Sequence, residues 1–151
     1  LLALSYGHVY VARIALGANP RQTLRALQEA DAYNGPSLVI AYSHCIAHGI
    51  DMANGLEQQK LAVQTGYWPL FRYNPDLRGT ETNPFSLDSK PPAKPLKDYT
   101  YNEVRYRMLS HTHPDIAKQL ATLAQKDVHT RWAHYEQLVK NFEPAANTNP
   151  A

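Results

Sequence analysis

A strand–helix–strand pattern in the first 42 residues is the feature that most constrains the fold. Residues 8–16 and 37–42 are rich in β-branched and aromatic side chains and almost continuously apolar, which is typical of strands covered on both faces. Residues 21–33, between them, carry apolar side chains at helical spacing. This order predicts a βαβ unit with parallel strands and a right-handed crossover. The expected fold class is α/β, with part of an open parallel sheet.

The helix of this unit has well-marked ends in the sequence. Asn19 is a favourable N-cap, and Pro20 occupies the first helical position, where its missing N–H costs nothing. An Asn-Gly-Pro sequence at residues 34–36 ends the helix. The side chains that share one apolar stripe of the predicted helix are Leu24, Leu27 and Ala30.

Shorter patterns predict the elements that follow. Residues 56–65 indicate a short helix, stopped by Gly66. Residues 67–73 are a third strand candidate, in which Pro69 favours an edge or terminal position because proline cannot donate to a ladder. Residues 74–98 contain five prolines and few large aliphatic side chains, which predicts an extended connector rather than another sheet layer.

Two helical patterns come after the connector, the first over residues 99–110 and the second from Pro114 onward. The second covers about 26 residues, so it would be roughly 39 Å long and would pack across a whole domain or onto a partner. Its apolar face is formed by Ile116, Leu120, Leu123, Ala124, Val128, Trp132, Tyr135 and Val139. The chain is thus divided into an α/β portion at 1–73, the connector at 74–98, helices at 99–142 and a flexible tail at 143–151.

Charge and hydropathy argue against nucleic-acid binding and membrane insertion. The formal net charge is only +2, and the basic residues are scattered. No stretch approaches the roughly 18 uncharged apolar residues that a membrane span needs. The single cysteine, Cys45, excludes an internal disulfide and fits a reducing compartment such as the cytoplasm. The first residues are core-like and include neither Met nor a basic leader, so we expect the chain to be a piece of a longer polypeptide.

Cys45 follows the second strand directly, at the edge where open parallel sheets bind ligands, and it has three interpretations. It could be a buried small hydrophobic residue, as free cysteines often are. It could belong to a zinc or nucleophile site with His44 and His48, although such sites need four ligands or a positioned base. It could also be one thiolate ligand of an iron–sulfur cluster whose other cysteines lie outside the chain.

The position of Cys45 suits the third interpretation physically. Backbone N–H groups in a loop at the end of a strand favour a thiolate and bind cluster sulfurs. Ile46 and Ala47 would shield the cluster from water, and Gly49 permits close approach of the backbone. Spacing alone leaves all three interpretations open.

Several long blocks of the chain resemble the pyruvate:ferredoxin (flavodoxin) oxidoreductases. Residues 35–49 look like the family segment that supplies the last cysteine of the cluster nearest thiamine diphosphate, and residues 6–12 resemble the strand before it. Residues 66–75, 83–90 and 102–106 match the family's downstream blocks in order and spacing. The likeness covers nearly the whole chain.

The resemblance implies the carboxy-terminal part of a thiamine-diphosphate-binding domain. Enzymes of this family decarboxylate pyruvate oxidatively, form acetyl-CoA from coenzyme A, and pass electrons through 4Fe–4S clusters to ferredoxin or flavodoxin as cytoplasmic homodimers. Of the family's functional positions only the cluster cysteine transfers, onto Cys45. The ligands of thiamine diphosphate and Mg²⁺, the pyruvate contacts and the other cluster cysteines would lie outside this chain, which we expect to be inactive alone.

Two alternative functions are kept beside this one. The chain could be a non-catalytic α/β module that binds a protein partner through the connector and the long helix, in which case it would fold alone without iron. It could also belong to an oxidoreductase for another 2-oxoacid, whose substrate contacts lie outside these residues. The leading hypothesis instead predicts an aggregation-prone piece, because half a sheet leaves a strand edge and apolar faces uncovered.

Overall fold

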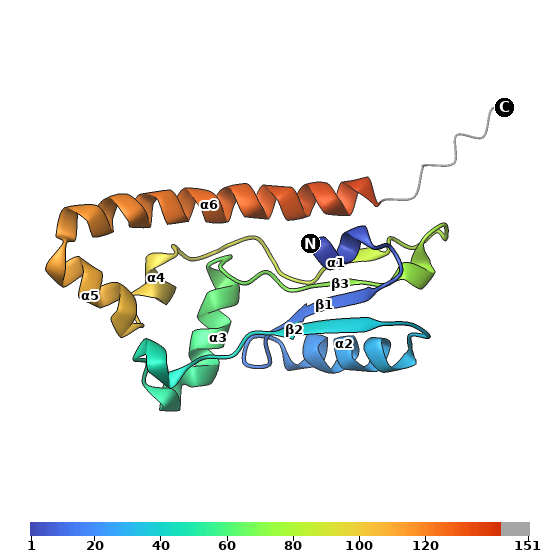
Figure 1. Cartoon of the computed structure of the whole chain (residues 1–151), viewed down its shortest axis with the longest axis horizontal. Coiled ribbons are helices and arrows are strands. Elements are labelled where there is room, and N and C mark those ends of the chain that lie inside the picture. Colours follow the sequence, from blue (N-terminus) through green and yellow to red (C-terminus); the bar gives the residue numbers. More distant parts are fainter. Residues whose placement is uncertain (143–151) are drawn as a thin grey trace.

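The computed structural model describes residues 1–142, and its centre is a four-stranded mixed sheet of strand order β2-β1-β3-β4 (Figure 1). β1 (Tyr10–Ile14) pairs in parallel with β2 (Ser37–Ala41). β3 (Phe71–Tyr73) runs antiparallel to β1, and β4 (Phe85–Leu87) runs antiparallel to β3. The α/β fold class is confirmed, with two antiparallel strands added to the expected parallel pair. The tail predicted at 143–151 lies outside the described residues.

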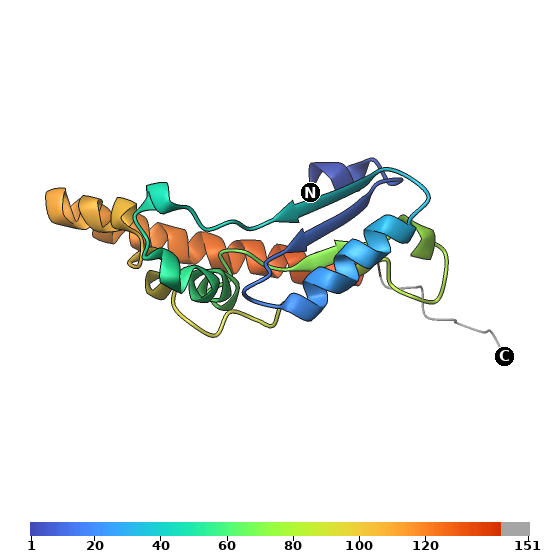
Figure 2. The same cartoon turned by 90° about the horizontal axis from the view of Figure 1, so that it is seen from below.

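The predicted βαβ unit is present. α2 (Pro20–Ala32) connects the two parallel strands, and Asn19 caps it by accepting a hydrogen bond from the backbone N of Gln22 at 3.0 Å. Ala26 of α2 packs in one cluster with Tyr10, Ala12 and Ile14 of β1. Figure 2 shows α2 in front of the sheet and α6 behind it, so the sheet lies between two helical layers.

Of the apolar stripe predicted for α2, only Ala30 packs against the sheet. Leu24 and Leu27 are 58% and 49% exposed, whereas Ala26 is fully buried. α2 approaches the sheet through small and polar residues, because Gln22 Nε2 finds a partner there and donates to Asp88 Oδ2 at 2.9 Å. Leu24 and Leu27 therefore remain on the outer surface.

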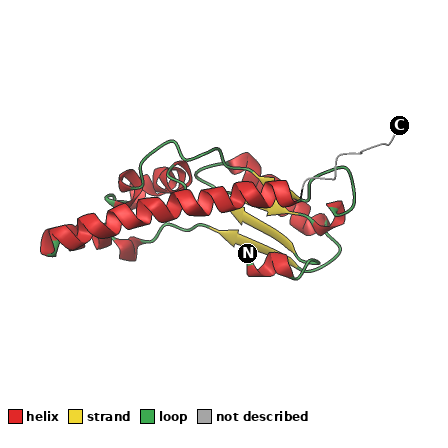
Figure 3. Ribbon diagram, turned by 90° about the horizontal axis from the view of Figure 1, so that it is seen from above, coloured by secondary structure: helices red, strands yellow, loops and turns green. Residues whose placement is uncertain are grey.

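β2 is an edge strand, and the prediction that it is covered on both faces is wrong for the described residues. Leu38 and Ile40 are 41% and 38% exposed. Val39 packs toward α2, so the alternation of a strand turns its two neighbours to the opposite face. Figure 3 shows α6 crossing the β4 side of the sheet and leaving the other edge clear. The short helix α1 (Leu2–Ser5) contacts β1 on this uncovered side.

The third strand and the connector also depart from the prediction. The third strand is shorter than expected, because Pro69 lies just before β3 rather than within it. The connector contains β4, which adds a strand to the edge of the same sheet and forms no second sheet layer within the described residues. Asn83 explains the extra strand: its Oδ1 accepts from the backbone N of Phe85 at 2.9 Å, and its Nδ2 donates to the carbonyl of Val139 at 2.8 Å. These bonds fix the start of β4 against α6.

The helices beyond the sheet follow the predicted order with one division. α3 (Gly55–Gln64) matches the short helix expected at this position. The first helix after the connector is split into α4 (Lys97–Thr100) and α5 (Val104–Thr112). The 3-10 helices are Ile46–His48, Met52–Asn54 and Pro75–Leu77.

α6 (Pro114–Asn141) has 28 residues and begins at the predicted proline. Trp132 and Tyr135 are buried as expected. Leu120 and Leu123, from the same predicted face, are 49% and 57% exposed, because the amino-terminal half of α6 extends beyond the sheet (Figure 1). None of the helices within residues 1–142 is both long and apolar enough to cross a membrane.

An aromatic core joins the sheet to α6. The Phe71 ring stacks on Phe85 with 5.2 Å between centroids and lies 5.5 Å from the ring of Tyr135. Val11 and Tyr73 complete this cluster. Each large side chain buried in this way stabilises the fold by about 1.5–3 kcal/mol relative to exposure.

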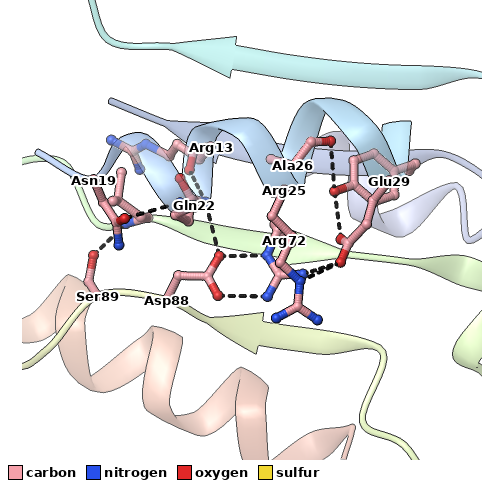
Figure 4. Close-up of polar contacts among 11 residues, drawn as sticks. Arg13, Asn19, Gln22, Arg25, Ala26, Glu29, Arg72, Asp88 and Ser89 are labelled. Atoms are coloured by element: carbon pink, nitrogen blue, oxygen red, sulfur yellow. Dashed lines mark hydrogen bonds and ion pairs between the residues drawn. The ribbon is translucent and has the colours of Figure 1, made fainter. Parts of the chain in front are cut away.

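Arg72 forms an ionic cluster on the opposite face of the sheet (Figure 4). The residue is 7% exposed, and it donates to both oxygens of Asp88 at 2.8 and 2.9 Å and to Glu29 at 2.5 Å. Burial alone would lower the pKa of Arg72, but its hydrogen bonds to the two carboxylates raise this pKa above the usual value. Tyr10 OH also donates to Glu29, at 3.0 Å. The cluster ties α2, β3 and the end of β4 together.

Candidate functional site

The candidate cysteine lies in the loop that leaves β2, here called the cysteine loop (residues 43–49). Cys45 is free, half-buried and extended (φ −136°, ψ 130°), and it is the N-cap of the 3-10 helix that begins at Ile46. The backbone N of His48 donates to the carbonyl of Cys45 at 3.0 Å. The predicted place of Cys45, just past the carboxyl end of the second strand, is confirmed.

Gly49 closes the cysteine loop in the left-handed conformation, with φ 70°. A Cβ at this position would lie 2.5 Å from the Cβ of Val104, at the start of α5. The backbone N of Val104 also donates to the carbonyl of Gly49 at 3.4 Å. The close backbone approach expected at Gly49 is therefore made to α5.

The two histidines of the loop have partners on different helices. His44 Nδ1 lies 3.1 Å from Gln59 Nε2 of α3, and Gln59 Oε1 accepts from the backbone N of Gly17 at 2.8 Å. His48 Nε2 lies 3.4 Å from Arg105 Nη1 of α5. Residues 1–142 hold no group of three or more His, Cys, Asp or Glu side chains able to bind a metal ion. A zinc site of His44, Cys45 and His48 is therefore not formed by this part of the chain.

Aromatic side chains support the base of the cysteine loop. Tyr42 OH and Tyr99 OH are 2.8 Å apart, and the Tyr99 ring stacks on Tyr67 with 4.5 Å between centroids. Burial, followed by the hydrogen bond with Tyr42, raises the pKa of Tyr99. Burial likewise raises the pKa of Tyr42. Both phenols are therefore protonated at neutral pH, and their hydrogen bond connects the end of β2 to α4.

A buried carboxylate, Glu103, lies beside the loop, and the sequence patterns gave no reason to single it out. Its side chain is 1% exposed, and Oε2 accepts from Arg105 Nε at 2.5 Å. Oε1 accepts from Gln58 Nε2 of α3 at 3.3 Å. Burial acts to lower the pKa of Arg105, but the hydrogen bond and charge of Glu103 raise it overall. A glutamate before a helix is usually exposed, so only the tertiary contact with α3 reveals this one.

Comparison with known proteins gives the loop its context. No protein-family model matches the chain. The chain is 50% identical over 138 residues to a pyruvate-flavodoxin oxidoreductase of Nostoc sp. and 52% identical over 137 residues to one of Rhodospirillum rubrum. It is 46% identical over 140 residues to a pyruvate:ferredoxin oxidoreductase of Moorella thermoacetica. The chain matches one segment of these oxidoreductases.

The match covers 91% of this chain for the first two relatives and 93% for the third. It covers only 12%, 11% and 12% of the lengths of those oxidoreductases, so most of each relative lies outside the matched segment. The resemblance stated from the sequence is thereby confirmed.

The donor chemistry of the loop fits one ligand of an iron–sulfur cluster and no more. A 4Fe–4S cluster is held by four thiolates, and Cys45 is the single cysteine of the chain. The outer side of the loop is open, since Ile46 is 71% exposed and Ala47 is also exposed. The shielding of a cluster by these two side chains stays a prediction.

Proposed function

We propose that this chain is the segment of a pyruvate oxidoreductase that supplies one thiolate, from Cys45, to a 4Fe–4S cluster. The complete enzyme decarboxylates pyruvate oxidatively to acetyl-CoA with coenzyme A and reduces ferredoxin or flavodoxin. One observation carries the proposal: a free, half-buried cysteine stands on a fixed loop in a chain about half identical to such oxidoreductases.

In this proposal the other residues of the chain hold Cys45 in place and take no direct part in the reaction. A bound cluster supplies one-electron transfer between the carbonyl chemistry and the acceptor protein. β2, the 3-10 turn and Gly49 fix the backbone from which the Cys45 thiol projects. The deprotonated thiolate is the form that binds iron.

Thiamine diphosphate, Mg²⁺ and the three other cluster ligands are assigned to polypeptide outside this chain. For the cluster ligands the donor set supports that assignment, because a 4Fe–4S cluster is held by four thiolates and Cys45 is the single cysteine of the chain. The same proposal includes a cytoplasmic homodimer, as the family resemblance implies.

Substitution of Cys45 tests this function directly. In the complete oxidoreductase that contains this segment, we expect Cys45→Ala to abolish the EPR signal of one cluster and to stop ferredoxin reduction, because one iron loses its thiolate. Ser43→Ala is the matched control, since Ser43 is exposed in the same loop and donates only to the neighbouring carbonyl of His44. An unchanged EPR spectrum for Cys45→Ala would contradict the proposal.

A protein-interaction module without iron is the second candidate. A groove of about 590 Å³ between α4, α5 and the amino-terminal half of α6 favours it, with apolar lining that includes Tyr101, Leu109 and Leu120. If the isolated 151 residues melt cooperatively as a monomer and bind a protein without iron, this candidate replaces the first. An oxidoreductase for another 2-oxoacid is distinguished by assaying the complete enzyme with a series of 2-oxoacids.

A further inference from the structure

The start of α5 holds the cysteine loop from one side. Val104 fills the space beside Gly49. A Cβ added at Gly49 would lie 2.5 Å from the Cβ of Val104. The next residue, Arg105, places Nη1 at 3.4 Å from His48 Nε2. The backbone N of His48 in turn donates to the carbonyl of Cys45 at 3.0 Å. A continuous series of contacts therefore leads from α5 to the backbone of Cys45.

Glu103 determines where the Arg105 guanidinium points. The Glu103 side chain is 1% exposed, and a buried carboxylate is stable only when it is paired and hydrogen-bonded. Arg105 Nε donates a hydrogen bond to Glu103 Oε2 at 2.5 Å, and Gln58 Nε2 donates to Glu103 Oε1 at 3.3 Å. Because a guanidinium is planar and rigid, fixing Nε on Glu103 also fixes the direction of Nη1. The ring of Tyr106, 4.7 Å from Arg105 Cζ, restricts it further.

We propose that Glu103 and Arg105 are positioning residues, which set the orientation of the Cys45 backbone through His48 and so the place of its sulfur. This inference rests on the proposed role of Cys45 as a cluster ligand. Neither residue is proposed as a ligand of the cluster. Replacing a residue that hydrogen-bonds to a metal ligand, and so orients it, typically lowers metal affinity or activity by about 10–100-fold.

The cysteine loop has other attachments that keep it folded without Arg105. His44 is held by Gln59 of α3, and Tyr42 is held by Tyr99 of α4. Loss of the Arg105 contact therefore loosens one side of the loop and leaves two sides attached. When the buried charge of Glu103 is removed as well, the effect belongs to the cluster, in its spectrum and its retention of iron, rather than to the fold of the enzyme.

Variants of both residues in the complete oxidoreductase test this role. For Arg105→Ala we expect shifted EPR g values for the cluster bound by Cys45 and about tenfold faster loss of its iron to a chelator. The double variant Glu103→Gln with Arg105→Ala removes the buried charge together with its partner, so it keeps the fold while losing the His48 contact. We expect it to show the same spectral shift with an unchanged melting temperature. Arg105→Lys keeps the positive charge but lacks the planar guanidinium. Its EPR shift and its rate of iron loss should lie between those of this variant and those of the wild type.

Arg107→Ala is the matched control, since Arg107 is an exposed arginine on the same helix and takes part in none of the ion pairs found within residues 1–142. Its spectrum and rate of iron loss should equal those of the wild type. If Cys45→Ala alters a cluster but the double variant and Arg105→Ala behave like Arg107→Ala, the positioning role is overturned while the proposed function stands. If Cys45→Ala alters no cluster, the proposed function itself fails.

Discussion

Arg72 shows what a single buried charge does in this molecule. Its guanidinium draws Glu29 of α2 and Asp88 after β4 onto the face of β3, joining segments that are far apart in the sequence. Both carboxylates are mostly buried, with side-chain exposures of 25% and 14%. Such a pair depends strongly on both partners, because removing one leaves an uncompensated charge in a poorly hydrated place.

Replacement of Arg72 by Met should therefore destabilise the pairing of β4 with β3. We expect a local loss of about 3–5 kcal/mol, since Asp88 and Glu29 lose their counter-ion. Faster amide hydrogen exchange over β4 measures it. Arg25→Ala is the control, because Arg25 pairs with the same Glu29 from a position that is 68% exposed, and exposed pairs contribute less than about 1 kcal/mol. Equal exchange rates in the two variants would show that the buried cluster does not hold β4.

The elements that local chemistry determines could be predicted from the sequence. Asn19 caps α2 and Pro114 opens α6 because each interacts with its own helix end. The buried face of α2 could not be predicted, since the buried Gln22 side chain finds its partners on other elements, the carbonyl of Arg13 in β1 and Asp88, which is 66 residues away. The same holds for β4, which depends on the contact of Asn83 with α6.

The candidate site divides in the same way. The place of Cys45 at the carboxyl end of a strand follows from the local pattern of residues 37–49. Its surroundings do not, because Glu103, Gln58 and Arg105 meet only once α3 and α5 have packed together. The local sequence therefore predicts the position of the thiol in the chain, whereas the contacts among Glu103, Gln58 and Arg105 depend on tertiary structure.

Packing between the cysteine loop and α5 gives a prediction at Gly49. Gly49→Ala combines a left-handed φ of 70° with a clash against Val104, so we expect a lower melting temperature and a perturbed cluster spectrum in the complete enzyme. Gly79→Ala is matched in backbone strain, with φ 77°, but has open space around it, and should cost only about 1–2 kcal/mol without a spectral change. Adding Val104→Gly to Gly49→Ala removes the Val104 Cβ that the new methyl group would meet, so it should restore the spectrum. Identical behaviour of the two alanine variants would mean that the contact with α5 is unimportant.

The molecule as a whole is covered unevenly. α2 protects one face of the sheet, and α6 protects β3, β4 and part of β1 on the other face but leaves β2 uncovered. Leu38 and Ile40 remain exposed on a strand whose outer edge has no partner within residues 1–142. Free strand edges with apolar side chains promote association with other chains.

The isolated chain should therefore self-associate. We expect sedimentation velocity to show species larger than the 17.0 kDa monomer at micromolar concentration. Leu38→Lys with Ile40→Lys should shift the distribution toward monomer, because charge on an edge strand opposes pairing. Lysines at Thr130 and Gln137, on exposed positions of α6 outside the groove, serve as a control of equal charge. A wild-type chain that stays monomeric would contradict this account and would favour the independent module.

α6 runs along the long axis of the molecule (Figure 1). At 28 residues it is about 42 Å long, with Val139 secured to Asn83 near one end and His113 linking it to α5 at the other. Its two ends are attached to different parts of the molecule, to the start of β4 through Asn83 and to α5 through His113, so the length of α6 sets how far apart these parts lie.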